Sequence, residues 1–550
     1  KGDRLAITLS TGKTVKGKAF FRTDYTEDGS WRDIPMRKSR GGGFVLEITL
    51  DKIGVFSGKA LFFPVGSKTP IWPQGENLKI KVVSSLVKSK NGIYTVFPRQ
   101  FGSFRAVRDK LDFIMGKLGF RIIQTLPPFP VPTTYAVMGE YGCPFAATDF
   151  FSVDPAMAQF DRSTTPLDQF CELISATHAR KGLFFIDLPA NHTGWASTLQ
   201  THHPEWFAKD DDGKFRSPGA WGVRWEDLVE LDYANEELVA YMAEVFLFWC
   251  KKGVDGFRCD AGYMIPEKAW RTIVSQVREQ YPDTVFMLEG LGGELSVTDS
   301  LLSAAGLDWA YSEIFQVYNR DQFEWYLPEA LRRSAKYGTL VNFAETHDND
   351  RLAKSGRTYA ALRVQLAALL SSQGAWGIAN GVEWLATEKI DVHGKGSLNW
   401  GSRENIVELI SKLNFILSKY ESFHGTEDLR LVTRGGGNTL AFQRGNDILV
   451  VANLDCENAA SVEFDRDSFR HNETVDLLSE KKVDSSKAIP LAPGQVMCLA
   501  SRQARFAEEP SYGVPEKDAF FKWRYPYDAK RDVVVVENED LEIPSPWHFM

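Results

Sequence analysis

Gly253-Val-Asp-Gly-Phe-Arg-Cys-Asp260 is the stretch of sequence from which the fold and the site can be worked out. Its composition is that of a short buried strand that ends in an arginine and an aspartate two positions apart. Because side chains alternate faces along a strand, Arg258 and Asp260 are expected to point the same way. The guanidinium would keep the carboxylate ionised, as a nucleophile at the end of a barrel strand requires. Taken alone, such a pair is more typical of a structural ion pair.

The composition is that of a globular protein with mixed charges. Of the 550 residues, 43% are hydrophobic and 25% are charged, and the net charge is −8. This balance argues against a nucleic acid or an anionic membrane as partner, and no apolar run approaches the roughly 18 residues of a membrane span. The six cysteines are dispersed without metal-type spacing, which favours a reducing, cytoplasmic compartment, although an even count also permits disulfides. The chain begins at Lys1, which is compatible with a removed signal segment.

Short β-type runs at both ends of the chain flank a long region in which strands and helices alternate. Residues 1–88 and 425–503 are each expected to form a β-sandwich. Residues 89–424 are expected to form a (β/α)8 barrel, an α/β fold of the TIM type. Its polar and aromatic insertion at 192–235 is expected to form a wall of the active site. Residues 504–550 are expected to be a tail or a linker.

Periodicity assigns individual elements of the barrel. Near-continuous apolar runs predict strands, and apolar residues at helical spacing predict helices between them. No glycine-rich phosphate loop follows any of these strands, so a dinucleotide-binding fold is unsupported. The predicted strands are 122–126, 183–188, 256–260, 285–289, 309–312, 340–345 and 376–379, and the predicted helices are 166–181, 236–252 and 267–281.

Four of these strands end in polar clusters. All strand carboxyl ends of a parallel barrel open on one face, so the clusters are expected to converge. Burying that much charge without a chemical role would be costly, and the convergence therefore predicts a catalytic site. In chain order the clusters are Asp187-Leu-Pro-Ala-Asn191-His192, Gly256-Phe-Arg258-Cys-Asp260, Phe286-Met-Leu-Glu289 and Phe343-Ala-Glu345-Thr-His347-Asp348.

The three carboxylates fit the cleavage of a glycosidic bond with retention. That reaction needs an ionised nucleophile and a protonated acid about 5–5.5 Å apart. Asp260, beside Arg258, suits the nucleophile, and Glu289, at the end of an apolar run that would raise its pKa, suits the acid/base. Asp348 is expected to bind sugar hydroxyls and to stabilise the oxocarbenium-like transition state. The two histidines of the clusters are expected to donate hydrogen bonds to the same sugar.

The four clusters, in this order, resemble the four conserved regions of the α-amylase family of glycoside hydrolases (family 13). The resemblance covers residues 92–500 and includes an accessory motif at 231–235. It implies the nucleophile at Asp260, the acid/base at Glu289 and the transition-state stabiliser at Asp348, with no cofactor. The substrate-binding residues that it implies are Phe145, Asp187, His192, Arg258, Tyr263 and His347.

The chain departs from the family's pattern around these residues. Phe145 stands where many members have a tyrosine that stacks on the sugar. Tyr263-Met264 stands where α-amylases often have a Lys-His pair that contacts the sugar beyond the scissile bond. Asn191 matches a calcium ligand of some α-amylases, but the insertion has no acidic cluster to complete a site of 6–8 oxygens, so no metal is expected.

The resemblance implies an enzyme that cleaves α-1,4-glucosidic bonds in α-glucans or maltooligosaccharides, and hydrolysis is the first expectation. The alternative is transfer to another sugar, as by 4-α-glucanotransferases or maltosyltransferases. It is supported by residues 94–102, which look like the start of the barrel in bacterial maltosyltransferases that use maltose 1-phosphate. A non-catalytic glucan-binding protein is disfavoured, because all three carboxylates are present. The sequence does not determine the oligomeric state.

Overall fold

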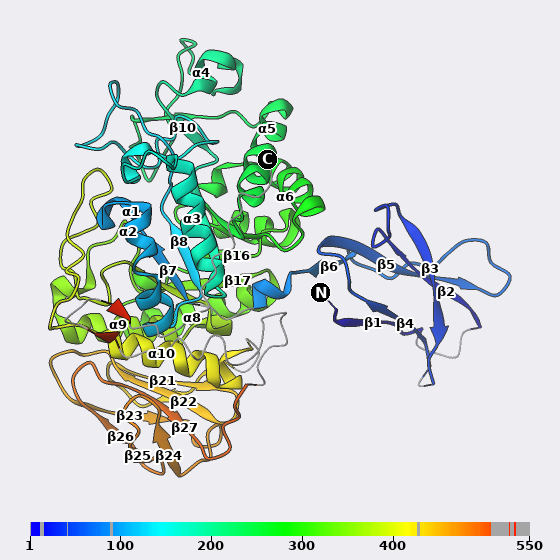
Figure 1. Ribbon diagram of the computed structural model, residues 1–550. Helices are drawn as coiled ribbons and strands as arrows, with labels where there is room; N and C mark the ends of the chain where they lie inside the picture. The colour runs from blue at the N-terminus through cyan, green and yellow to red at the C-terminus, as the bar shows by residue number, and fades with distance from the viewer. Residues whose placement is uncertain are drawn as a thin grey trace.

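A closed parallel barrel lies between β-rich regions in the computed structural model (Figure 1). Beyond residue 507 only the short strands β28 (Tyr527–Asp528) and β29 (Val533–Val534) are described, so most of the predicted tail lies outside the described residues. Within the described residues, no helix is long and apolar enough to cross a membrane. The structure describes residues 2–11, 16–40, 42–88, 92–425 and 429–507, with those two strands.

The barrel closes through eight parallel strands in the order β14-β15-β16-β17-β18-β7-β8-β9. All seven strands predicted from apolar runs are present, and β7 at the start of the barrel completes the circle. The strands are almost wholly buried, which explains why their sequences lack an alternating pattern. They are β7 (Ile93–Val96), β8 (Ile122–Thr125), β9 (Leu183–Leu188), β14 (Gly256–Cys259), β15 (Val285–Leu288), β16 (Trp309–Tyr311), β17 (Thr339–Phe343) and β18 (Trp376–Ala379).

Helices connect the barrel strands, and the three predicted helices are confirmed to within two residues at either end. The start of α3 is fixed by a capping box, in which the Thr165 hydroxyl accepts from the backbone N–H of Asp168 at 3.1 Å. In return the Asp168 carboxylate accepts from the N–H of Thr165 at 2.7 Å. The helices are α1 (Pro98–Phe101), α2 (Phe104–Arg108), α3 (Pro166–Ala179), α4 (Thr198–His202), α5 (Glu236–Lys251), α6 (Glu267–Gln280), α7 (Leu295–Ser300), α8 (Arg320–Lys336), α9 (Arg357–Leu369) and α10 (Val407–Lys419).

The insertion at 192–235 has secondary structure of its own. Its first strand, β10 (His192–Gly194), pairs antiparallel with β13 (Leu228–Glu230), so the two ends of the insertion are tied together. Between them lie α4 and the hairpin of β11 (Gly219–Ala220) and β12 (Val223–Arg224). Because β10 begins four residues after β9 ends, the insertion extends from the carboxyl ends of the barrel strands, where Figure 1 shows β10 and α4.

A two-sheet sandwich follows the barrel, as predicted. Its sheets have the orders β19-β21-β22-β27-β24-β25 and β20-β23-β26, and they share one apolar core. The strands are β19 (Leu429–Leu431), β20 (Thr433–Arg434), β21 (Thr439–Arg444), β22 (Ile448–Asn453), β23 (Ala460–Phe464), β24 (Glu473–Asp476), β25 (Lys482–Asp484), β26 (Ile489–Leu491) and β27 (Val496–Ala500).

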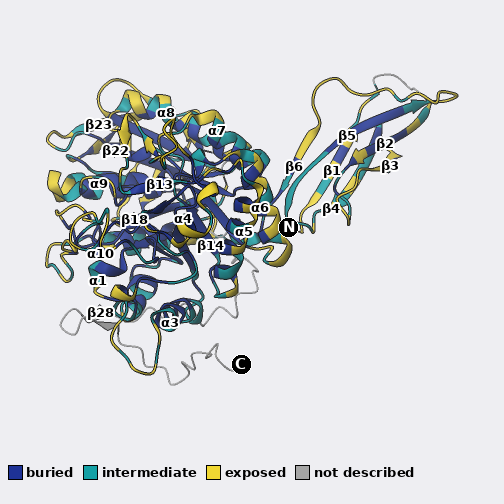
Figure 2. Ribbon diagram, turned by 90° about the horizontal axis from the view of Figure 1, so that it is seen from above, coloured by how far each residue is buried: buried dark blue, intermediate teal, exposed yellow. Residues whose placement is uncertain are grey.

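The N-terminal region is one antiparallel sheet, β1-β4-β3-β2-β5-β6, folded over on itself. Two strands separate β4 from β5 in this order, yet the rings of Phe44 and Phe62 lie 5.7 Å apart across a common core. Figure 2 shows this sheet projecting from the side of the barrel. Its strands are β1 (Arg4–Leu9), β2 (Gly17–Thr23), β3 (Arg32–Lys38), β4 (Phe44–Thr49), β5 (Gly54–Pro64) and β6 (Leu78–Val82).

Lys81, on the last strand of this sheet, joins the sheet to the barrel. Its ammonium group donates to the backbone carbonyls of Leu302 at 2.7 Å, Leu307 at 2.5 Å and Tyr337 at 3.1 Å. Burial lowers the pKa of Lys81 to about 8. A single side chain therefore satisfies three carbonyls that have left water at the junction.

Replacing Lys81 by methionine is expected to destabilise the protein by about 1–3 kcal/mol, because buried carbonyls lose their donor. The change is measured as a lower Tm in differential scanning calorimetry. Lys79→Met is the matched control, since Lys79 lies on the same strand and is exposed. Equal Tm values for the two variants would show that the three carbonyls contribute nothing to stability.

Candidate active site

Arg258 and Asp260 face one another at the end of β14, as side-chain alternation predicts. Nη1 of Arg258 donates to Asp260 Oδ1 at 2.6 Å. The same nitrogen also donates to both oxygens of Asp187 on the neighbouring strand β9, at 2.9 and 2.7 Å. Asp187 is fully buried, so it orients the guanidinium, and the guanidinium in turn fixes one oxygen of Asp260.

His192 lies on the other side of Asp260. Its Nε2 is 3.8 Å from Asp260 Oδ2, which is too long for a hydrogen bond. The ring is buried, and neither of its nitrogens has a hydrogen-bond partner within the described parts of the chain. Burial lowers the pKa of His192, so the imidazole is neutral at pH 7. A buried neutral ring with an unpaired N–H is suited to donate to a ligand hydroxyl.

Glu289 follows β15 and is held by two backbone amides. Its Oε2 accepts from the N–H of Ala261 at 3.0 Å and its Oε1 from the N–H of Leu291 at 2.8 Å. The left-handed conformation of Ala261, with φ of 44°, belongs to the turn that presents this N–H. Burial, with the negative field of Asp260, raises the pKa of Glu289 to about 7. A carboxyl group with this pKa can give and retake a proton near neutrality.

The fourth cluster places His347 and Asp348 differently. His347 is buried and stacks on the ring of Phe145, with centroids 5.3 Å apart and an interplanar angle of 19°. Its Nε2 lies 3.2 Å from Oδ2 of Asp348, and burial lowers the pKa of His347. The Asp348 side chain is 68% exposed, against 14% for Asp260. Asp348 is thus open to a ligand while its neighbours are already held in place.

Two aromatic residues flank the loop that follows Glu289. A Cβ built on Gly293 would lie 2.8 Å from Cδ2 of Tyr263, and one built on Gly292 would lie 2.6 Å from Cζ2 of Trp221. Only glycine therefore allows both rings to approach this backbone. Tyr263 is half-buried, and Trp221, from the insertion, is 74% exposed. Exposed rings of this kind offer apolar faces on which a sugar can stack.

Two residues of the predicted clusters form hydrogen bonds with protein groups outside the candidate site. Glu345 is buried and accepts from Arg351 Nη1 at 2.8 Å and from the backbone of Leu352. The side-chain amide of Asn191 donates to Sδ of Met264 at 3.2 Å, which links the start of the insertion to the turn that carries Tyr263. We assign neither residue a role in binding substrate or calcium.

The structure adds Tyr311 to the residues found by sequence reasoning. The guanidinium of Arg258 lies over its ring at 5.3 Å and over the ring of Phe145 at 5.8 Å. Tyr311 is buried at the end of β16. Its signal in the sequence was a polar aromatic residue at the end of a predicted barrel strand.

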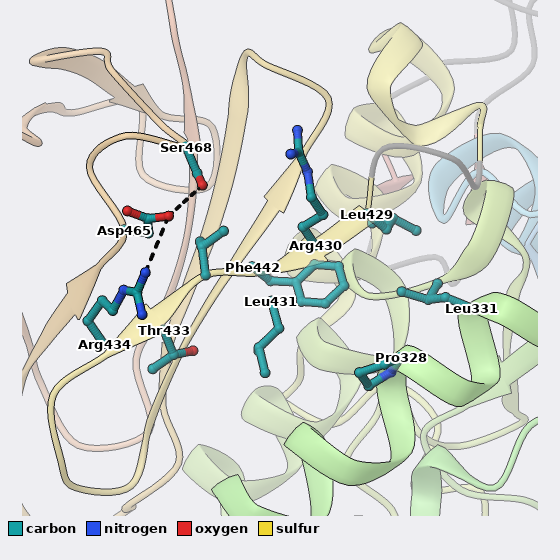
Figure 3. Close-up of a pocket in the computed structure, with 11 residues that line it drawn as sticks. Pro328, Leu331, Leu429, Arg430, Leu431, Thr433, Arg434, Phe442, Asp465 and Ser468 are labelled. Carbon is teal, nitrogen blue, oxygen red and sulfur yellow. Dashed lines mark hydrogen bonds and ion pairs between the residues drawn. The ribbon is translucent and has the colours of Figure 1, made fainter.

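A cavity of about 380 Å³ lies away from these residues, between α8 and the C-terminal sandwich (Figure 3). Pro328 and Leu331 of α8 face Leu429, Leu431 and Phe442 of the sandwich across it. None of the candidate site residues lines this cavity. It separates two domains, and we assign it no function.

Comparisons with known proteins agree with the barrel. The family described as "Alpha amylase, catalytic domain" matches residues 83–299. An alpha-1,4-glucan:maltose-1-phosphate maltosyltransferase from Rhodospirillum rubrum is 28% identical over 46% of this chain and 39% of its own length. One from Picrophilus torridus is 24% identical over 67% of this chain and 61% of its own length. The chain thus spans less than two thirds of these curated relatives.

Solved structures share the fold at low sequence identity. The alpha-amylase from Lactobacillus plantarum has a TM-score of 0.63 and 24% identity, and the match covers 76% of this chain and 99% of that one. A cyclomaltodextrinase has a TM-score of 0.61 and 16% identity, and it covers 90% of this chain and 96% of that one.

A parallel barrel with an arginine-bound aspartate and a buried glutamic acid near its strand ends is compatible with enzymes that act on glycosidic bonds. Residues 83–299 match the catalytic-domain family of the α-amylases, which groups glycoside hydrolases with related transferases.

Proposed function

We propose that this protein cleaves α-1,4-glucosidic bonds of α-glucans or maltooligosaccharides with retention of configuration. The observation that carries the proposal is the pairing of Asp260, fixed by Arg258, with Glu289, whose pKa is raised to about 7. One group is set to attack as an anion and the other to donate a proton at the same pH.

In the proposed first step, Asp260 attacks the anomeric carbon while Glu289 protonates the departing oxygen. The glycosidic bond breaks, and an ester forms between the sugar and Asp260. His192, His347 and Asp348 would hold the hydroxyls of the reacting sugar. In the second step Glu289, now ionised, takes a proton from the acceptor hydroxyl, and the acceptor displaces Asp260.

The acceptor in the second step is either water or another sugar, and we propose transfer to a sugar alongside hydrolysis. Two observations favour transfer: the relatives described above carry the name maltosyltransferase, and Trp221 and Tyr263 flank the loop after Glu289. Aromatic rings at this place would hold an acceptor sugar and exclude water.

The product lengths from maltoheptaose test the proposal and separate its two forms. Chains shorter than the substrate indicate cleavage, and chains longer than the substrate indicate transfer. A second reaction contains maltose 1-phosphate and a glucan acceptor. It tests whether this protein uses maltose 1-phosphate, which is part of the relatives' name, as a donor. Unchanged maltoheptaose together with unchanged maltose 1-phosphate would contradict the proposed function.

Replacing Tyr263 by alanine is expected to lower the fraction of elongated products by about threefold to tenfold, because an aromatic contact of about 0.5–1.5 kcal/mol is lost. The measurement is the ratio of longer to shorter products from maltoheptaose. Tyr337→Ala, at the opposite end of the barrel before β17, is the control and should leave the ratio unchanged. An unchanged ratio in Tyr263→Ala would remove Tyr263 from the acceptor site.

A further inference from the structure

A thiol, a carboxylate and an imidazole meet beside the proposed site, and none of them takes part in the proposed reaction. The ligand atoms of Cys143, Asp227 and His393 all lie within 4.8 Å of one another. The three residues come from the connection after β8, from the insertion and from the segment after β18. These are the three side-chain types that bind zinc in proteins. Their separation along the chain explains why sequence spacing did not reveal them.

Contacts outside the cluster hold two of the three segments together. Arg99 is buried, and its Nη1 donates to the carbonyls of Gly142 at 3.1 Å and Val392 at 2.9 Å. Its Nη2 donates to the carbonyl of Tyr141 at 3.2 Å. The backbone N–H of Tyr141 in turn donates to the carbonyl of His393 at 3.1 Å. One guanidinium thus fixes the residues next to Cys143 and His393, so their approach is built into the fold.

The third segment, which carries Asp227, is held separately. Leu228 is the first residue of β13 and packs in one small apolar cluster with Cys143. Indole Nε1 of Trp195 donates to the carbonyl of Glu226 at 2.8 Å. The carboxylate of Asp227 is therefore positioned from both sides by its neighbours rather than by the thiol or the imidazole alone.

The chemistry of the cluster argues against a catalytic cysteine. Burial, with the negative charge of Asp227, raises the pKa of the Cys143 thiol well above its usual range. Such a thiol is a poor nucleophile, whereas a catalytic cysteine needs a lowered pKa. A bound divalent cation would instead lower the pKa of this thiol, because the cation stabilises a thiolate and a carboxylate together.

The geometry is close to what a metal of the zinc type needs. Sulfur, nitrogen and oxygen ligands lie about 2.0–2.3 Å from zinc, and hence about 3.5 Å from one another in a tetrahedral site. The three ligand atoms, now within 4.8 Å of one another, would move closer together on binding. Three protein ligands leave the fourth position of a tetrahedral site to a water molecule.

We propose that Cys143, Asp227 and His393 form a binding site for a divalent cation of the zinc type, which ties the insertion to two loops of the barrel. On binding, the thiol releases one proton to solvent, and the carboxylate and the imidazole supply the other two ligand atoms. The site lies near the substrate cleft: Phe145, two residues after Cys143, stacks on His347. The metal takes no part in bond cleavage and acts by fixing this wall of the cleft.

Titration of the untagged protein with Co²⁺ tests the proposal directly. We expect one equivalent to bind with a thiolate-to-metal charge-transfer band in the near ultraviolet and strong visible bands typical of tetrahedral Co²⁺. One equivalent of Zn²⁺ should remove these bands and raise the Tm, because it binds the folded state only. Cys143→Ser should lose the charge-transfer band, and His393→Gln should weaken binding by about 100-fold.

Cys456→Ser is the matched control, because Cys456 lies outside this cluster and is the one cysteine of the described residues that is not buried. It should retain both the band and the Tm shift. The proposal is overturned by a titration without a thiolate band, by a band lost in Cys456→Ser but kept in Cys143→Ser, or by equal Zn²⁺ affinity in wild type and His393→Gln. Circular dichroism shows whether each variant is folded. None of these measurements depends on glucan cleavage, so they stand apart from the proposed function.

Discussion

Replacing Asp260 by asparagine is expected to reduce cleavage of maltoheptaose by about four to six orders of magnitude, the range seen when a catalytic nucleophile is removed. The amide can still accept the hydrogen bond from Arg258 Nη1, which in the wild type spans 2.6 Å. It cannot form the covalent ester on which the proposed second step depends. The variant should also show no increase in mass when it is incubated with a fluorinated sugar that traps glycosyl-enzymes.

Asp299→Asn provides a matched control for this loss. Asp299 also accepts from an arginine, Nε of Arg333, at 2.7 Å, and its side chain is 19% exposed against 14% for Asp260. It lies on α7 and belongs to none of the strand-end clusters. Activity should be preserved in Asp299→Asn. If Asp260→Asn stayed within about tenfold of the wild type, the nucleophile would have to be another residue.

Replacing Glu289 by glutamine is expected to reduce cleavage of natural glucans by about 10²–10⁴-fold, because the leaving oxygen loses its proton donor. A glycosyl fluoride should be affected far less in the first step, since fluoride leaves without protonation. The comparison between the two substrates separates loss of the acid from loss of binding. Equal losses on both substrates would contradict the role of Glu289 as the acid.

The pH dependence of the wild type follows from the same residue. Glu289 has a pKa of about 7 and must be protonated to act as the acid. The value of kcat/KM should therefore be steady just below pH 7 and fall by about tenfold per pH unit above it. This basic limb should be absent in Glu289→Gln.

Glu383→Gln is the control for the pH profile. Burial also raises the pKa of Glu383 to about 7, and its Oε1 accepts from the hydroxyl of Tyr94 at 2.5 Å. Glu383 belongs to none of the strand-end clusters proposed to bind the sugar. Its variant should keep the basic limb of the profile. Loss of the limb in Glu383→Gln and its retention in Glu289→Gln would reverse the assignment.

The barrel was open to prediction because its signals are local. Buried parallel strands have near-continuous apolar sequences, and each predicted strand lies within one or two residues of an observed one. The N-terminal sheet was predicted only as a β-sandwich. In the structure, a single sheet folds over and brings Phe44 against Phe62. This arrangement depends on pairings between distant strands, which no local sequence pattern specifies.

In the candidate site, too, some contacts follow from local sequence patterns and others do not. Strand alternation places Arg258 beside Asp260, and the common direction of the strands brings Asp187 within reach of the same nitrogen. The same reasoning placed Glu345 in the fourth polar cluster, although the structure pairs it with Arg351, six residues later. Sequence order alone does not say which of two nearby partners a carboxylate will take.

By itself, then, the sequence determined the barrel, the strand ends near which Asp260, Glu289 and Asp348 lie, and the family that their motifs resemble. Periodicity and residue type are sufficient for these, because both act along a single strand. The tertiary structure was needed to show that the pKa of Glu289 is raised and that Cys143 lies close to His393. Burial and electrostatic fields arise from groups far apart in the chain, and their strength depends on distances that exist only after folding.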